Sequence, residues 1–528
     1  MARVGGGRLP GPAPLTGRRR AAPVVVVGAG HNGLVAACYL ARAGRDVVVV
    51  EQLDRPGGGS RTEETLPGHR FDLHSAAHNI INMTDIPDQL DLRGAGLDYL
   101  EMDPFSVAVH ADGRRVRFFR SVEATVESIA EESPGEALAY RRFVDKALPV
   151  VRTVLPAVRG DASPRALPAQ VANLARALRR RPLATVRDAL SPYDPLLRRW
   201  LPSDLTRGPV AAFAAHAGVG PMVPGGSLFA FWQAAYHLFG QWHGRGGAQN
   251  LTDALVARLA SLGGELRCSA AVDRIEAPGG EVRAVALEGG ERIEASAVIT
   301  AMDPKTALLG LLDPPLGGDE AADLAAARRS NVVQAVVHVA TDRLPPYPGA
   351  RDGDWNGLQS YVDRLGELTA AWARAEAGRL GDPLPLYAFT PSAIDDRLSP
   401  PGRHTVYLAC PAAPSVIEGG WPVRRQELVE RCLDVVEARA PGFRASVTGV
   451  ATWTPDDMER VERWPGGHPM YLDIALDQLG PFRPTRGLGR WRTPVAGLYV
   501  SGAGTNPSGG ISGTPGRQAA RALLADAR

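Results

Sequence analysis

Two apolar runs dominate the start of the chain. Val24–Val27 and Val47–Val50 are each four consecutive valines, and a stretch of small and apolar residues from about Gly33 to Ala43 lies between them. A short, continuous β-branched run is typical of a strand that is buried in a parallel sheet, and a longer segment between two such strands is typical of the connecting helix. The pattern therefore predicts a strand, a helix and a second strand.

The turn between the first strand and the helix carries Gly28, Gly30 and Gly33. In a G-x-G-x-x-G turn the first glycine allows the tight turn, the second lets the backbone approach a pyrophosphate, and the third lets helix and strand pack closely. Glu51 follows the second strand, 18 residues after Gly33. An acid in this place is expected to bind ribose hydroxyls, so the residues predict a dinucleotide-binding unit.

The next residues make the prediction more specific. Arg55 to Thr62 read RPGGGSRT. This run resembles the R-x-G-G-x-x-x-T signature of the flavoprotein superfamily that contains amine oxidases, phytoene desaturases and protoporphyrinogen oxidases. The resemblance implies FAD rather than NAD alone, which stays open as an alternative. It also implies that the cofactor contacts in this run are Gly57, Gly58, Ser60, Arg61 and Thr62.

The middle of the chain changes character. From about Asp85 to Arg245 the periodicity is helical and few strands are expected. Residues 151–200 hold ten arginines against three aspartates and no glutamate, interleaved with apolar residues. This pattern predicts amphipathic helices with either a solvated face or a face for a membrane surface.

Six aromatic residues fall within 14 positions of a chain that is only 6% aromatic. They favour either the wall of an apolar cavity or an ordinary core helix. In both cases a bulky apolar substrate is easier to accommodate than a small polar one. The six are Phe229, Phe231, Trp232, Tyr236, Phe239 and Trp242.

Residues 251–304 read as a helix, a strand, a meander and the short strand Ala297–Thr300. In the resembled families this segment returns the chain to the FAD domain, and the backbone around Val272 then touches the adenine end of the cofactor. Residues 305–440 supply strands of a second sheet. There is no second strand-GxGxxG-helix unit in the sequence, so a separate NAD(P)H domain is not expected.

The C-terminal stretch predicts a strand (Gly497 to Val500), a glycine-rich loop and a helix from about Ser512. The N-terminus of such a helix can stabilise the anionic reduced flavin ring. The run GAGTNPSGGISG is similar to the GAGTHPGGGxxG of phytoene desaturase-like proteins, whereas amine oxidases typically read LYFAGE. The resemblance is close to the type called pyridine nucleotide-disulfide oxidoreductase domain-containing protein 2, and it implies cofactor contacts at Gly502, Ala503, Gly504, Gly510, Ile511 and Ser512.

Composition excludes several classes of protein. Lys+Arg 59 and Asp+Glu 57 leave a net charge of +2, so no nucleic-acid partner is indicated. No apolar run reaches the roughly 18 residues of a membrane-spanning helix, which predicts a soluble, cytoplasmic or membrane-peripheral protein. The cysteines form no CxxC pair and predict small core residues rather than a disulfide framework or a metal site. They are Cys38, Cys268, Cys410 and Cys432.

Taken together, the sequence predicts an α/β fold: a Rossmann-like FAD-binding domain of the glutathione reductase type with an inserted mixed-sheet and helical substrate domain. The expected FAD-binding domain comprises residues 24–85, 246–304 and 490–528, and the expected substrate domain comprises residues 86–245 and 305–489. Residues 1–23 are expected to form a disordered tail.

The predicted function is a phytoene desaturase-like dehydrogenase. A hydride would pass from a C–H bond of an apolar or conjugated substrate to flavin N5, with oxygen or a quinone as the electron acceptor. His78, His468 and Asp477 are the candidate bases, and His74 lies in the same crossing segment as His78. One alternative is a flavin amine oxidase, although only Lys146 and Lys305 could supply its usual lysine. Another is a lipid-binding escort protein on the same fold.

Overall fold

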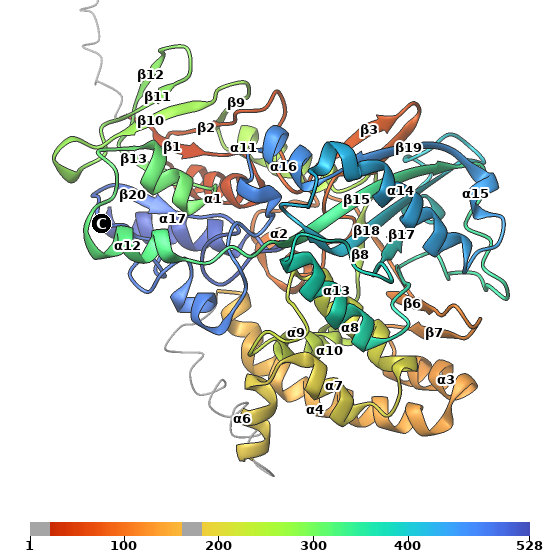
Figure 1. Ribbon diagram of the computed structural model, residues 1–528. Helices are drawn as coiled ribbons and strands as arrows, with labels where there is room; N and C mark the ends of the chain where they lie inside the picture. Colours follow the sequence, from red (N-terminus) through yellow and green to blue (C-terminus); the bar gives the residue numbers. More distant parts are fainter. Residues whose placement is uncertain (1–21, 161–181, 528) are drawn as a thin grey trace, which may run out of the picture.

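The computed structural model describes residues 22–160 and 182–527 of the 528-residue chain. The predicted tail and much of the arginine-rich stretch therefore lie outside the described residues. Figure 1 shows three parts, which are a sheet flanked by helices at the upper left, a second sheet on the right and a group of helices at the bottom.

The first sheet contains the predicted strand pair. Its order is β20-β13-β1-β2-β9, and every neighbouring pair is parallel. All four valines of β1 are buried, which explains why this strand has no polar alternation. The strands are β1 (Val24–Val27), β2 (Val47–Val50), β9 (Glu265–Arg267), β13 (Ala297–Thr300) and β20 (Leu498–Val500).

Helices pack around this sheet. α1 (His31–Arg42) lies beside both α11 (Gln249–Ser261) and α17 (Thr514–Asp526). The expected meander is a separate four-stranded sheet at the top of Figure 1. It comprises β10 (Val272–Glu276), β11 (Ala284–Leu287), β12 (Arg292–Glu294) and β14 (Leu312–Asp313).

The second large sheet has seven strands in the order β19-β15-β18-β17-β16-β6-β7. It is mixed, because β16 pairs with β6 in parallel while the other pairs are antiparallel. Its strands are β6 (Ser106–Val109), β7 (Arg115–Phe118), β15 (Val332–Thr341), β16 (Leu358–Ser360), β17 (Tyr387–Phe389), β18 (His404–Pro414) and β19 (Val447–Trp453).

Two of these strands come from the part of the chain for which few strands were expected. β6 and β7 form a hairpin on residues 106–118 and extend the sheet whose other strands follow residue 330. β5 (Tyr99–Glu101) also lies in this part and pairs with β8 (Trp242–Gly244). β6 and β7 are buried at every position although their residues are not all apolar, so they show neither a continuous apolar run nor a match between alternation and burial, and periodicity alone missed them.

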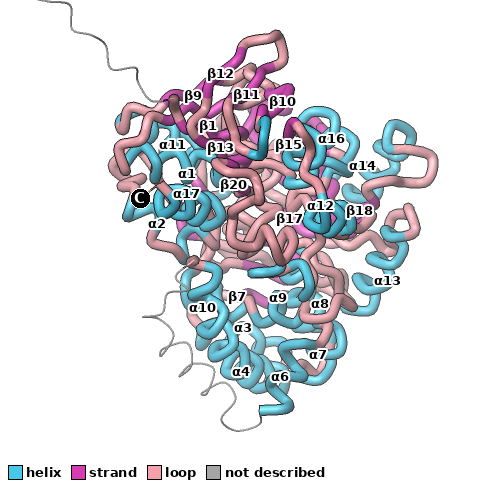
Figure 2. The backbone as a smooth tube through the Cα atoms, turned by 90° about the vertical axis from the view of Figure 1, so that its left-hand side faces the viewer, coloured by secondary structure: helices cyan, strands magenta, loops and turns pink. Residues whose placement is uncertain are grey.

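The remaining part of the insertion is helical, and Figure 2 shows its helices gathered at the lower end of the molecule. Buried aromatic and aliphatic side chains join these helices to the second sheet in one large core. The helices are α3 (Val122–Glu132), α4 (Pro134–Val158), α6 (Pro182–Leu190), α7 (Tyr193–Trp200), α8 (Asp204–His216), α9 (Ser227–Phe231) and α10 (Gln233–Phe239).

Smaller elements complete the described chain. β3 (Thr62–Leu66) and β4 (His69–Asp72) form a hairpin, and the other α-helices are α2 (Ile86–Gln89), α12 (Gly318–Ala326), α13 (Leu365–Glu376), α14 (Trp421–Glu437), α15 (Phe443–Ser446) and α16 (Pro455–Glu462). A π-helix covers Thr306–Leu311, and 3-10 turns cover Ile81–Met83, Pro278–Gly280, Pro391–Ala393, Pro465–Gly467, Leu476–Gln478 and Gly480–Phe482.

Two sequence expectations concern burial. Cys38, Cys410 and Cys432 are buried free thiols, as expected of small core residues, and Cys268 is half-buried. In the described part of the chain, no helix combines the length and the apolar character needed to cross a bilayer.

Candidate active site

A cavity of about 550 Å³ lies where the first sheet, the second sheet and the helical part meet. Its lining includes backbone from the N-terminal glycine turn, from the loop before β3 and from the loop before α17. These three segments are distant in sequence, and each carries one of the predicted cofactor motifs. The fold therefore brings the two ends of the chain to one site.

The N-terminal turn is shaped by its glycines. Gly28 has a φ of +99°, which favours glycine, and a Cβ on Gly33 would lie 2.0 Å from the carbonyl oxygen of Gly28. Gly30 lines the cavity, and a Cβ there would enter open space. The close approach expected at Gly33 and the exposed backbone expected at Gly30 are thus both present.

The C-terminal loop faces this turn. Gly513 precedes α17 with a φ of +70°, and a Cβ on Gly516 would lie 1.9 Å from the carbonyl oxygen of Asn32. α17 therefore packs directly on the start of α1, and the N-termini of both helices point toward one place. Of the residues expected to contact the cofactor here, all but Gly504 line the cavity, namely Gly502, Ala503, Gly510, Ile511 and Ser512.

The loop before β3 divides into two parts. Gly58 lines the cavity, whereas Ser60, Arg61 and Thr62 hold the loop in place. The hydroxyl of Ser60 donates to the carbonyl of Ala248 (3.0 Å) and that of Thr62 donates to Asp72 (2.6 Å). The guanidinium of Arg61 is buried and lies 2.9 Å from a carboxylate oxygen of Glu462. Gly57, with a φ of +134°, makes the turn between these two parts.

Glu51 is buried at the end of β2. Its carboxylate accepts hydrogen bonds from the backbone N–H groups of Ala29 (2.8 Å) and Leu53 (3.1 Å). Burial raises the pKa of Glu51, and these two bonds oppose that effect. The acid thus lies beside the glycine turn, and its contact with a ribose stays a prediction. Val272 is partly buried in β10, outside the cavity lining, and its adenine contact also stays a prediction.

The three candidate bases lie in different surroundings. His78 is buried outside the cavity lining, and its Nδ1 is 2.8 Å from the hydroxyl of Tyr99. Burial lowers the pKa of His78 to about 3. The side chain of Asp477 is 63% exposed and is paired with Arg328. The structure therefore does not bring these two side chains into the cavity.

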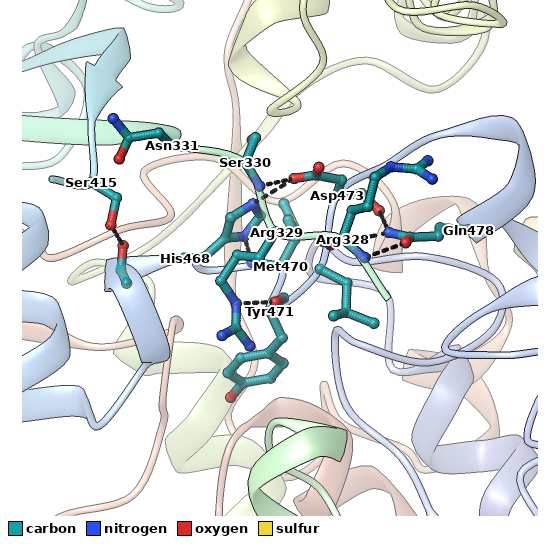
Figure 3. Close-up of polar contacts among 12 residues, drawn as sticks. Arg328, Arg329, Ser330, Asn331, Ser415, His468, Met470, Tyr471, Asp473 and Gln478 are labelled. Atoms are coloured by element: carbon teal, nitrogen blue, oxygen red, sulfur yellow. Dashed lines mark hydrogen bonds and ion pairs between the residues drawn. The ribbon is translucent and has the colours of Figure 1, made fainter. Parts of the chain in front are cut away.

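His468 is the candidate base that lines the cavity. As Figure 3 shows, it lies in a network that joins its loop to the strand entry at residues 328–331. The N–H of Met470 donates to its Nδ1 (3.2 Å), and its Nε2 lies 3.6 Å from Asp473, which accepts from the N–H of Ser330 (2.7 Å). Burial lowers the pKa of His468, and the bond to Asp473 opposes this effect.

Arg483 binds the main chain of the loop that carries His468. Its side chain is fully buried, yet its N–H groups donate only to main-chain carbonyls. Burial lowers the pKa of Arg483 to about 10, so the group stays charged near neutral pH. One carbonyl belongs to the C-terminal loop and four belong to the loop of His468; they are those of Ala503, Met470, Leu472, Asp473 and Gln478.

The aromatic cluster both lines the cavity and contributes to the core, the two alternatives that the sequence left open. Phe229, Trp232 and Tyr236 line the cavity, while Phe231 lies in the core between the helices. α4 contributes Val154, Ala157 and Val158 to the same wall. This side of the cavity is therefore apolar, and it faces the glycine loops.

Sequence reasoning gave no role to two histidines that line the cavity, His31 and His216, whereas His74, which it noted in the crossing segment, also lines the cavity. His31 follows Gly30 in the turn, and its position there was visible as a departure from the usual motif. His216 ends α8, and no motif surrounds it. Its place on the cavity depends on packing between distant segments, for which the local sequence has no signal.

Comparison with known proteins identifies the site. The family model described as flavin containing amine oxidoreductase matches residues 33–524. The chain belongs to this family. Its members bind a flavin, so the motifs at both ends of the cavity are those of an FAD-dependent oxidoreductase.

Individual relatives and a solved structure agree with this assignment. The chain is 28% identical over 550 residues to the pyridine nucleotide-disulfide oxidoreductase domain-containing protein 2 of Rattus norvegicus, covering 95% of this chain and 93% of the relative. It is 27% identical over 518 residues to a lycopene-forming phytoene desaturase of a Paracoccus strain, covering 95% and 97%. A triple mutant of putrescine oxidase has the same fold, with a TM-score of 0.59, 18% identity and coverage of 96% and 98%.

The residues around the cavity fit FAD. Two helix N-termini and glycine backbone converge on the cavity, an arrangement that suits a pyrophosphate. Two polar atoms at the start of α1, Nε2 of His31 and Oδ1 of Asn32, are buried without a hydrogen-bond partner among the described residues. Burial lowers the pKa of His31 to about 4, so its ring is neutral and can donate or accept. The backbone N–H groups of the two helix N-termini, together with these two unpaired polar atoms, therefore fit a dinucleotide.

Proposed function

We propose that this FAD-dependent oxidoreductase is a dehydrogenase or desaturase that removes a hydride from a C–H bond of an apolar or conjugated substrate. The supporting observation is a single cavity in which glycine loops form one side and the apolar wall of α4, α9 and α10 forms the other. Placement of a C–H bond against a bound flavin is the main requirement of such chemistry.

FAD bound at the glycine loops supplies the hydride acceptor. The chain's own part is to hold the substrate and to exclude water, and Phe229 and Trp232 are placed for this. We further propose that the FAD contacts are the predicted residues of the two loops together with Glu51 and Val272. The division into an FAD-binding domain (24–85, 246–304, 490–528) and a substrate domain (86–245, 305–489) is part of the same proposal.

The proton left by the substrate goes to a base or to water. Among His78, His468 and Asp477, we favour His468 because its side chain lines the cavity. Its ring is neutral near pH 7, since burial lowers its pKa. It can act as a base only if Nδ1 exchanges its bond with the N–H of Met470 for the substrate proton.

A flavin amine oxidase is the second candidate, and the family match favours it. The lysines argue against the usual form of that site. Lys305 donates to the carbonyls of Ala325 (2.8 Å) and Ala327 (2.6 Å), and Lys146 donates to Thr185 (2.6 Å). Neither residue lines the cavity. The escort-protein alternative is set aside, because the chain is an FAD-dependent enzyme.

The electron acceptor is proposed to be oxygen or a quinone, since the sequence has no second nucleotide fingerprint. We place the protein in the cytoplasm or at the periphery of a membrane. The apolar substrate is the reason for the membrane-peripheral alternative.

The test is anaerobic reduction of the FAD-loaded protein. Polyenes, other apolar alkenes and amines are mixed in turn with the enzyme, and the visible flavin spectrum is recorded before and after oxygen or a quinone is admitted. Bleaching by an alkene or polyene supports the proposal. Bleaching by amines alone moves the function to an amine oxidase, and a spectrum that no substrate changes contradicts both.

A further inference from the structure

The apolar wall carries two polar side chains that hydride transfer does not use. His216 ends α8, Gln334 lies in β15, and both line the cavity. The register of β15 against β18 shifts between Val333 and Ala335, and such irregularities turn a side chain out of its ordinary alternation. As a result Val333 and Gln334, which are neighbours in sequence, both face the cavity.

His216 has no hydrogen-bond partner within the described residues. Its ring meets Tyr387 edge to face, with centroids 5.1 Å apart, and lies 6.2 Å from the ring of Phe389. Burial lowers the pKa of His216 to about 4, so the imidazole is neutral near pH 7. It then offers one N–H donor and one nitrogen lone pair to the cavity.

Gln334 is held by two tyrosines. The hydroxyl of Tyr387 donates to its Oε1 (2.8 Å), and its Nε2 donates to the hydroxyl of Tyr407 (2.6 Å). An amide nitrogen carries two hydrogens, and these bonds use one of them. The second N–H has no acceptor within the described part of the chain, so Gln334 presents one free donor from a fixed position.

Tyr387 joins the two groups, because it contacts the ring of His216 and bonds to Gln334. The polar patch therefore consists of His216 and Gln334 on either side of one tyrosine, and His74 and Ser75 line the same cavity. Both side chains are partly buried and open onto the cavity, and a few polar groups placed in an apolar cavity are what orients a polar group of a ligand.

We propose that His216 and Gln334 bind a hydroxyl group of an otherwise apolar substrate. A hydroxyl donates one hydrogen and accepts others, so it can donate to the lone pair of His216 and accept the free N–H of Gln334 at the same time. A pure hydrocarbon leaves both groups unpaired. The inference rests on the proposed function and specifies it: the substrate is an alcohol with a long apolar skeleton.

The experiment compares 1-dodecanol with dodecane as ligands of the FAD-loaded protein. Dissociation constants are measured from the change in flavin absorption for the wild type and for His216→Phe, which keeps an aromatic ring against Tyr387. Comparing one ligand across two proteins removes the difference in solubility between the ligands. A neutral hydrogen bond is worth a factor of about 3 to 10, so the alcohol should bind that much more weakly to the variant, with no change for the hydrocarbon.

Two further variants separate polarity from shape. His216→Gln keeps a donor and an acceptor and should recover part of the alcohol affinity. Phe229→Leu removes apolar surface elsewhere on the wall and should weaken both ligands by the same factor. Equal changes for both ligands in His216→Phe, or no change for either, would overturn the proposal and leave an ordered water as the partner of the patch.

If His216→Phe does not fold, the wild type still answers the question. With ¹⁵N-labelled histidine, the ring signals of His216 should shift on addition of 1-dodecanol and stay in place on addition of dodecane; unchanged signals overturn the proposal. Failure of both ligands to bind the wild type contradicts the proposed function itself, which distinguishes it from a failure of the hydroxyl site alone.

Discussion

The two sides of the cavity are built in opposite ways. The nucleotide side is made of backbone, and at Gly33 and Gly516 there is no room for even a Cβ. The apolar side is made of side chains, from α4, α9, α10 and the loop around His468. Backbone close approach depends on a few residues in fixed places, whereas a wall of side chains tolerates exchange of one apolar group for another. The nucleotide side should therefore be the more sensitive to small substitutions.

The largest effect is expected from Gly33→Ala. The added methyl group would lie 2.0 Å from the Gly28 carbonyl, so helix and turn must separate. We expect little folded protein, with a loss of more than about 3 kcal/mol, as measured by thermal unfolding and by yield.

Gly30→Ala is the matched control in the same turn. A Cβ there meets nothing within 4 Å but projects where the cofactor is proposed to lie. The variant should fold and lose FAD, as measured by the ratio of flavin to protein absorption. If both variants fold and keep FAD, the nucleotide side is not built on backbone approach.

Arg483→Met tests the side chain that joins the two sides of the cavity. The substitution leaves three carbonyls without a donor among the described residues, those of Leu472, Gln478 and, in the C-terminal loop, Ala503. The carbonyls of Met470 and Asp473 keep a second donor. We expect a loss of about 3 kcal/mol in the free energy of unfolding, together with weaker FAD retention.

Arg492→Met provides the comparison for that measurement. Arg492 pairs with Asp526, and both side chains are 43% exposed, so its loss should cost less than about 1 kcal/mol. An equal cost for the two arginines would show that the buried carbonyl contacts of Arg483 contribute little.

His243, in β8, makes the stability of the folded protein depend on pH. Both ring nitrogens face acceptors, Nδ1 the carbonyl of Ala76 (3.2 Å) and Nε2 the carboxylate of Asp395 (3.1 Å). Burial opposes the charge, but the bond to Asp395 and the charge of Asp72 outweigh it and raise the pKa of His243 above 6.5. The stabilisation is therefore complete below about pH 6.5 and is lost as the pH rises through the folded pKa.

His243→Asn should thus cost more stability near pH 5.5 than near pH 9, as measured by urea unfolding of the FAD-loaded protein. His404→Asn is the control, because burial lowers the pKa of His404 and the trend with pH should have the opposite sign. A cost for His243→Asn that is the same at both pH values would contradict a charged imidazolium.

The difference between the two sides also explains what could be predicted. Gly28 and Gly33 act through local backbone, so their spacing predicted the turn and a dinucleotide, while the valine runs predicted the strands. The resemblance carried by residues 55–62 and by the run at Gly502 implied FAD. The family comparison confirms that prediction. β6 and β7 are as short as β1 and β2 but are not continuous apolar runs, so they gave no comparable pattern.

For the apolar side, the sequence predicted the apolar character of the cavity but not the polar residues that line it. The aromatic cluster predicted a bulky apolar substrate, but His216 and Gln334 reach the cavity because α8 and β15 both pack against β18, which no local pattern records. Asp477 lay in a promising segment, yet the structure turns it to the surface, where it pairs with Arg328. Side-chain direction in a loop depends on contacts that are distant in sequence.

Glu51→Ala gives the smallest expected effect and tests a side chain of the nucleotide side. Its carboxylate lies beside the glycine turn and bonds to the N–H groups of Ala29 and Leu53, so its loss removes both the predicted ribose contact and a brace of the turn. We expect FAD to bind about tenfold more weakly, as measured by titration of the apoprotein. Asp54→Ala, in the same loop with a 77% exposed carboxylate, should leave that affinity unchanged. If Glu51→Ala and Asp54→Ala bind FAD equally well, the ribose site lies elsewhere and the nucleotide side is built of backbone alone.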